Sequence, residues 1–252
     1  MTVSYLPFAL CIFFLAGFTQ GIVGFGFSII SVSMLTLLTA STADIVGLNL
    51  IPAALNGAVL FYLVRRDVAY RRVLIFILVC GLFTIPGILF LRFLDRATVM
   101  LTLGAAVLGI TFFSMVRTSR KSGFFSRPSF GYGAAMVSGF LAGAFTVPGP
   151  PMIAYFYNTE PSAKQAKANI QFYFVGLNLI IVPLFICNGL LDGKTFISGL
   201  CALPLVVVST WIGHRVALRL PVPVFSRIVN IFLIVLGLSI LIRASFSLWS
   251  GQ

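Results

Sequence analysis

Four amide side chains lie within long apolar stretches, where polar groups are rare. Asn49 and Asn56 are seven residues apart, and Gln171 and Asn178 repeat this spacing in the second half of the chain. In a helix, this spacing places both side chains on one face. An amide in hydrocarbon is costly unless it hydrogen-bonds another amide, free backbone or a ligand. The four amides therefore indicate either an anion site built from uncharged donors or hydrogen bonds that only join helices.

Two turns rich in glycine and proline interrupt apolar segments. The first is Gly24-Phe25-Gly26, and the second runs from Thr146 to Pro151. A helix that starts after such a turn exposes backbone N–H groups, and its partial positive charge attracts anions. Plain tight turns are the alternative. The predicted substrate-binding residues are Gln20, Gly24, Phe25, Gly26, Ser28, Asn49, Asn56, Thr146, Pro148, Gly149, Pro150, Gln171 and Asn178, and Tyr155 is a weaker candidate donor.

The sequence lacks the groups that most other chemistries need. The five acidic residues stand at the ends of apolar segments, and the single histidine, His214, opens a basic loop. No Ser/His/Asp set, HExxH motif, P-loop or Cys/His metal spacing is present. We therefore expect no enzyme activity, no metal site, no cofactor and no proton relay inside the membrane.

The composition is typical of a polytopic membrane protein. The chain of 252 residues is 60% hydrophobic and 9% charged, whereas soluble domains carry about 25% charged residues. Breaking the sequence at charges, prolines and glycines gives ten apolar segments. They lie near 3–24, 26–39, 44–64, 73–91, 98–116, 129–147, 150–159, 166–190, 195–213 and 228–248.

Segments 26–39 and 150–159 are too short to cross a bilayer upright with ease. They are expected to be half-length helices or arms of re-entrant hairpins. The fold class is thus all-α, with about 8 to 10 transmembrane helices, two of them short or broken.

The 17 basic residues predict the orientation of these segments, and they are not read as a nucleic-acid surface despite the net charge of +12. If all ten segments change side and both termini face outward, 13 basic residues lie inside and 4 outside. If each short segment merges with its predecessor, the division is 10 against 7. The positive-inside rule favours the first arrangement.

The two halves of the sequence resemble each other. At a shift of 122 residues, Gly17 and Gly21 fall on Gly139 and Gly143, and Asn56 falls on Asn178. The two Gly-x-x-x-Gly pairs are read as helix-packing seams. Further along, Pro86 matches Pro204 with a slip of four residues. Because each half has five elements, the sequence predicts one membrane domain built from two inverted repeats, residues 1–121 and 122–252, as in secondary transporters.

These turns and this duplicated layout resemble the TauE/SafE family of sulfite and organosulfonate exporters. The likeness covers essentially the whole chain and is most specific at 139–151, GFLAGAFTVPGPP. Pro148 and Phe27 stand where the family usually has glycine. The resemblance implies transport of small sulfur-containing or carboxylate anions across a bacterial cytoplasmic membrane.

The sequence and the resemblance together predict a secondary transporter that exports sulfite, sulfoacetate or a related organosulfonate by alternating access. A passive anion channel and an importer of a small carboxylate or sulfonate are the alternatives. The expected partners are a small organic or inorganic anion and membrane lipid, with no nucleic acid. Apolar outer faces would permit a homodimer.

Overall fold

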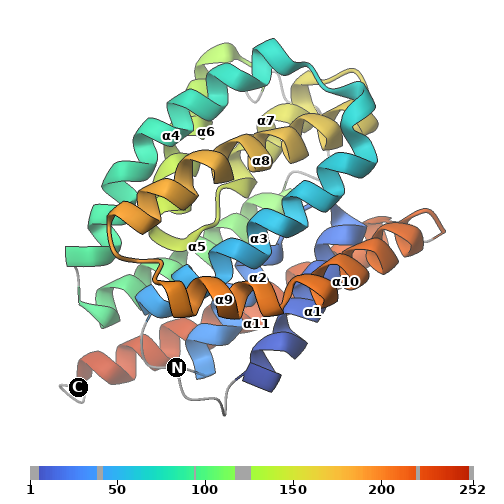
Figure 1. Cartoon of the computed structure of the whole chain (residues 1–252). Helices are drawn as coiled ribbons and strands as arrows, with labels where there is room; N and C mark the ends of the chain where they lie inside the picture. The colour runs from blue at the N-terminus through green and yellow to red at the C-terminus, as the bar shows by residue number, and fades with distance from the viewer. Residues whose placement is uncertain (1–5, 39–41, 94, 117–125, 220–221, 250–252) are drawn as a thin grey trace.

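The computed structural model of the chain describes residues 6–38, 42–93, 95–116, 126–219 and 222–249. All regular structure in these residues is helical, as the sequence predicted (Figure 1). The elements are α1 (Leu6–Val23), α2 (Phe27–Leu38), α3 (Thr42–Val64), the 3-10 turn η2 (Arg65–Asp67), α4 (Tyr70–Phe93), α5 (Arg96–Val116), α6 (Pro128–Phe145), α7 (Gly149–Thr159), α8 (Ala163–Cys187), α9 (Gly193–Cys201), α10 (Leu203–Ala217) and α11 (Val222–Trp249).

Nine of the ten predicted segments correspond to one helix each, and the segment predicted at 195–213 is the exception. It is divided into α9 and α10, which meet at a bend of 45°. Pro204 lies in the first turn of α10. Because proline lacks the N–H that would bond back to the preceding turn, it favours a helix start at this position.

Both predicted helix breaks are present, and each is followed by a short helix. Helix α2 has 12 residues and α7 has 11, which correspond to about 18 and 16 Å at 1.5 Å per residue. Gly24 and Gly26 have φ angles of 89° and 106°, and Thr146 has a φ of 55°. These left-handed conformations end α1 and α6, since a right-handed helix cannot continue through them.

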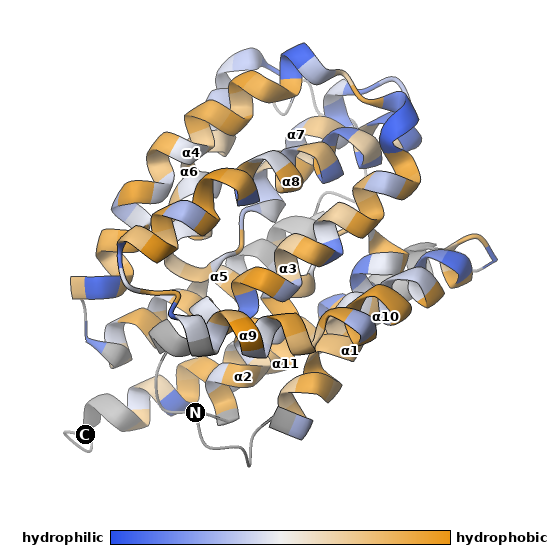
Figure 2. Ribbon diagram, viewed as in Figure 1, coloured by the Kyte–Doolittle hydropathy of each residue, from blue (hydrophilic) through white to orange (hydrophobic). Residues whose placement is uncertain are grey.

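The helices form a multi-pass membrane protein. Four described helices are long and apolar enough to cross a membrane, or five if the bent α9–α10 pair is one span. Hydrophobic residues cover most of the ribbon, and polar residues gather towards helix ends (Figure 2). Large apolar side chains such as Leu82, Leu179 and Phe246 are exposed on the outer surface. Lipid tails would cover these side chains, since hydrocarbon is as apolar as leucine.

Two helix pairs flank a central pair. Helix α4 packs on α6 at one edge, α1 packs on α10 at the other, and α3 and α8 lie between them (Figure 1). Helix α5 packs along α11, while the short helices α2 and α7 contact α3 and α8 respectively. The two breaks are therefore held against the central pair, which carries the four predicted amides.

The Gly-x-x-x-Gly pair of α6 lies at a close helix contact. A Cβ added at Gly143 would overlap the Thr84 carbonyl oxygen, and one added at Gly87 would overlap the Phe140 carbonyl oxygen. Small residues permit such an approach of two backbones in a membrane. The structure thus supports the packing interpretation of this pair.

The pair in α1 makes the corresponding contact with α10. A Cβ at Gly21 would overlap the Thr210 carbonyl oxygen, and one at Gly213 would overlap the Phe18 carbonyl oxygen. This contact matches Gly87 with Gly213, a shift of 126 residues, whereas the sequence comparison matched Pro86 with Pro204. Pro86 lies inside the unbroken α4, so the proline match does not describe equivalent places in the fold. The inverted repeat and its division at residue 121 remain predictions.

Candidate functional site

Residues of both helix breaks line one small cavity, which has a volume of about 40 Å³. A single buried water needs about 10 to 15 Å³ on this measure, so the space suits a few waters or a small oxyanion. The lining residues are Gln20, Phe25, Gly26, Phe27, Ser28, Ile29, Ala53, Thr146, Val147, Pro148, Gly149, Phe174 and Asn178. All of these residues are uncharged.

Eight of the thirteen predicted site residues line this cavity. They are Gln20, Phe25, Gly26, Ser28, Thr146, Pro148, Gly149 and Asn178. Gly24, Asn49, Asn56, Pro150 and Gln171 lie outside the lining. The sequence analysis did not select the other five lining residues, which are Phe27, Ile29, Ala53, Val147 and Phe174. Helical spacing points to two of them, because Phe174 is three residues after Gln171 and Ala53 is four residues after Asn49.

The start of α2 offers backbone donors to the cavity. The Gln20 side-chain carbonyl accepts the Phe27 N–H at 3.0 Å and so caps the new helix. The next two N–H groups, of Ser28 and Ile29, have no hydrogen-bond partner among the described residues. Both residues line the cavity. Free N–H groups at a helix N-terminus are suited to bind an anion.

The start of α7 offers fewer backbone donors than the sequence suggested. Pro148, Pro150 and Pro151 have no N–H, which leaves Gly149 as the donor of this stretch. Pro150 and Pro151 also border a separate apolar cavity with Phe130 on α6. Pro150 is not among the residues that line the central cavity, and its role as a substrate contact remains a prediction.

Asn49 positions the lining without belonging to it. Its side-chain NH₂ group donates to Ser28 Oγ at 3.0 Å and to Thr146 Oγ1 at 2.6 Å, and its carbonyl accepts from Ser31 Oγ. The Thr146 hydroxyl donates its own hydrogen to the Phe145 carbonyl. Ser28 Oγ accepts from Asn49, and its hydroxyl hydrogen has no acceptor among the described residues. The Ser28 O–H is therefore a donor available to the cavity.

Thr146 stands at a backbone position that usually favours glycine, and the hydrogen bonds of its hydroxyl explain why a threonine can occupy it. It is the one non-glycine residue of the described chain with a positive φ, a conformation that is unusual for a β-branched residue. Such a backbone costs about 1 to 3 kcal/mol. Its hydroxyl bonds with Asn49 and Phe145 offset part of this cost and tie the α6–α7 turn to α3.

Gln171 makes the equivalent contact with the other break. Its NH₂ group donates to the Gly24 carbonyl at 2.6 Å, and its carbonyl oxygen is buried without a partner among the described residues. Gly24 and Thr146 are 122 residues apart, and so are Asn49 and Gln171. Each amide thus reaches from the central helix of its own half to the turn of the other half.

Asn56 was predicted to contact the substrate, but it is not among the residues that line the cavity. Its carbonyl accepts from Thr210 Oγ1 of α10 at 2.7 Å. Seven residues of helix span about 10 Å along the axis, so Asn49 and Asn56 share a face without reaching the same small cavity. Asn178 borders the cavity, and its NH₂ group has no partner among the described residues.

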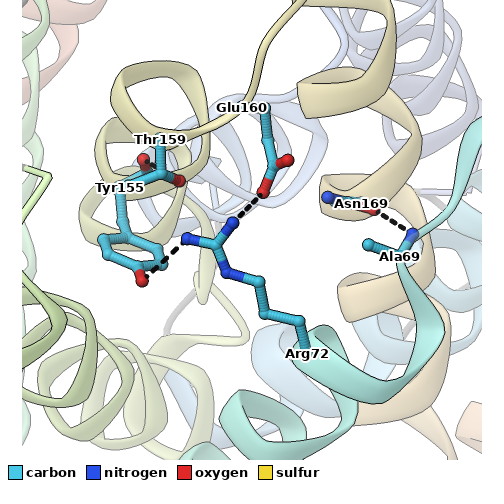
Figure 3. A network of polar contacts seen from close by, with 6 residues as sticks. All are labelled: Ala69, Arg72, Tyr155, Thr159, Glu160 and Asn169. Atoms are coloured by element: carbon cyan, nitrogen blue, oxygen red, sulfur yellow. Dashed lines mark hydrogen bonds and ion pairs between the residues drawn. The ribbon is translucent and has the colours of Figure 1, made fainter.

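A polar cluster lies at the far end of α7 (Figure 3). Arg72 donates to Glu160 at 3.0 Å and to the Tyr155 hydroxyl at 3.0 Å. The Glu160 side chain is only 3% exposed, although the residue stands at a segment end as the sequence indicated. Tyr155 therefore serves this cluster and does not supply a donor to the central cavity. Nearby, the Asn169 carbonyl accepts the Ala69 N–H at 2.8 Å.

The comparisons with known proteins give one match. Residues 9–240 match the family described as sulfite exporter TauE/SafE. No curated protein matches the chain, and no solved structure does so either.

Proposed function

Because the chain belongs to the sulfite exporter TauE/SafE family, we propose that it exports a small sulfur-containing oxyanion by alternating access. Sulfite, sulfoacetate and related organosulfonates are the proposed substrates. Family members are membrane transporters of sulfur-containing anions, and the fold is that of a multi-pass membrane protein. The observation that carries the proposal is the uncharged cavity at the meeting point of the two helix breaks.

The cavity has the chemistry to hold an oxyanion. Its lining residues offer as donors the N–H and O–H of Ser28, the N–H of Ile29 and Gly149, and the amide of Asn178. A pyramidal or tetrahedral group with three outer oxygens can accept several of these bonds at once. The start of α2 adds partial positive charge. None of the lining residues carries a full charge, so we expect binding weak enough to permit release.

The α1–α2 turn separates this cavity from a wider vestibule at one end of the molecule. Ile22 and Val23 border the vestibule, while Phe25 and Gly26 border the central cavity. Gly24 lies between them, fixed by its bond from Gln171. The positive φ values of Gly24 and Gly26 give this turn a backbone that can change conformation at low cost. Movement of the turn is the proposed step that opens the cavity to the vestibule.

We further propose that the two halves are inverted repeats, because the equivalent bonds of Asn49 and Gln171 cross between them. By the distribution of basic residues, both termini face outward in a bacterial cytoplasmic membrane. A membrane potential that is negative inside then drives anions outward by about 2.3 kcal/mol per charge per 100 mV. Export in this direction needs no coupling ion.

Efflux from proteoliposomes tests the proposal. Vesicles loaded with sulfite, sulfoacetate, taurine, sulfate or short carboxylates should release sulfite or a sulfonate faster than protein-free vesicles. The rate should saturate with substrate, because each cycle moves one bound anion. A rate that rises linearly with concentration would favour the channel, and release of none of these anions would refute the proposed function.

A further inference from the structure

The vestibule beyond the α1–α2 turn has a volume of about 830 Å³. The ends of α1, α3 and α10, the turn η2 and the start of α8 form its walls. Its charged lining residues are Arg65, Arg66, Asp67, Lys164 and Lys167. With four cations and one anion, the lining has a net charge of +3.

A loop position or an ion pair accounts for most of these charged residues, but neither accounts for Lys167. Arg65, Arg66 and Lys164 stand in or beside a loop, where the positive-inside rule places basic residues. Lys164 also pairs with Asp67 at 3.0 Å. Lys167 is the fifth residue of α8 and partly buried, and its ammonium group pairs with no carboxylate of the described residues.

Lys167 packs against Gly24 in the turn that separates the vestibule from the central cavity. Its Cε is 3.2 Å from the position that a Cβ on Gly24 would occupy. His214 borders the same vestibule, and its Nδ1 is buried without a partner among the described residues. The unpaired Lys167 ammonium of this lining is a group that an oxyanion would satisfy, and a neighbouring imidazole adds a polar side chain to the same wall.

The basic character belongs to one end of the molecule and is absent from the equivalent positions of the other half. At the shift of 122 residues, Lys167 corresponds to Ile45, and Arg66 corresponds to Asn188. His214 corresponds to Ile88 at the shift of 126 that the helix contacts indicate. The predicted repeat therefore does not account for these charges.

We propose that the vestibule is a second anion site, in which the sulfite or sulfonate binds to Lys167 before it passes the Gly24 turn to the central cavity. This inference rests on the proposed function, since it assigns a docking site to the same substrate. The net charge raises the local concentration of anions at the vestibule, as basic clefts do for charged substrates. Lys167 is the vestibule cation that packs on the Gly24 turn, so it directs the anion to the turn.

Transport kinetics in vesicles of zwitterionic lipid test this inference. A cleft of this kind raises on-rates by about 10- to 1,000-fold, so one of three net charges accounts for about 2- to 10-fold. Lys167→Gln should therefore lower kcat/KM for sulfite by this factor, while Lys167→Arg should retain most of it. Arg219→Gln is the matched control, because Arg219 is exposed at the same end but does not line the vestibule.

Ionic strength supplies a readout that a merely structural role would not affect. Raising it from about 0.01 to 0.15 M shortens the Debye length from about 30 to 8 Å. This change should lower kcat/KM of the wild type more than that of Lys167→Gln. Arg66→Gln, an exposed change in the same vestibule, should show the same trend more weakly and serves if Lys167→Gln does not fold.

The outcomes separate this inference from the proposed function. If the wild type transports sulfite and Lys167→Gln behaves like Arg219→Gln at both ionic strengths, the vestibule site is refuted and the proposed function stands. If the wild type transports no anion, both are refuted. An effect of Lys167→Gln that appears only when anionic lipid is added would show that the vestibule binds lipid headgroups, which would also overturn the inference.

Discussion

Replacing Ser28 by alanine tests the central cavity with a small change. The substitution removes one hydroxyl from the lining and leaves the backbone N–H groups of α2 in place. A hydrogen bond to a charged acceptor contributes about 1.5 to 3 kcal/mol. Because 1.4 kcal/mol corresponds to a tenfold change in Kd, Ser28→Ala should weaken sulfite binding by about 10- to 100-fold.

The cost in stability should be much smaller. Ser28 accepts one bond, from Asn49 Nδ2, and that amide keeps its second acceptor, Thr146 Oγ1. Side-chain hydrogen bonds inside membrane proteins contribute about 0.6 kcal/mol on average. The melting temperature of the free protein should therefore fall only slightly, while the increase that sulfite gives to the wild type should largely disappear.

Calorimetric titration of the purified protein with sulfite at constant ionic strength measures the change in affinity. Ser239→Ala is the matched control, because this hydroxyl is exposed on α11 and bonds the Val235 carbonyl of its own helix at 2.8 Å. The control should bind sulfite like the wild type. Wild-type affinity in Ser28→Ala would show that the hydroxyl does not contact the anion, and the proposed donor set would be wrong.

Three further predictions concern the framework around the cavity. Gly143→Ala should lower the free energy of unfolding by about 3 kcal/mol through backbone overlap with α4. Gly133→Ala in the same helix has open space around it and should leave the melting temperature unchanged or higher. Equal effects of the two substitutions would contradict the packing seam. Arg72→Gln should destabilise the protein by about 3 kcal/mol because it leaves the buried Glu160 unpaired. Glu160→Gln should cost only about 1 kcal/mol, because the Arg72 side chain is 41% exposed and water can solvate it. Thermal melts in detergent that rank the two variants in the reverse order would refute this reasoning. Asn56→Ala should lower the melting temperature yet leave sulfite affinity within about twofold, and a large loss of affinity in a titration would return Asn56 to the binding site.

Features that depend on local sequence were predictable. Runs of apolar residues located the helices, and glycine or proline located both breaks, because these residues act on the backbone where they stand. The bend before α10 was missed although Pro204 causes it. Pro86 stands inside α4 without a break, so proline alone does not decide whether a membrane helix bends.

Features that depend on which helices meet were harder to predict. The seven-residue spacing places Asn49 and Asn56 on one face of α3, but only the packing shows that Asn56 meets α10 while Asn49 meets the start of α2 and the α6–α7 turn. The pair of Arg72 and Glu160 joins residues that are 88 positions apart. No spacing rule within one helix describes such a contact.

Anomalous diffraction from crystals soaked with selenite, the heavier analogue of sulfite, tests the central claim most directly. The claim is that a small oxyanion binds where the two helix breaks meet. It predicts a selenium peak in the central cavity, placed so that the selenite oxygens accept hydrogen bonds from Ser28 Oγ and the Gly149 N–H. A cavity without such a peak, in crystals where selenite binds only at other places, would contradict it.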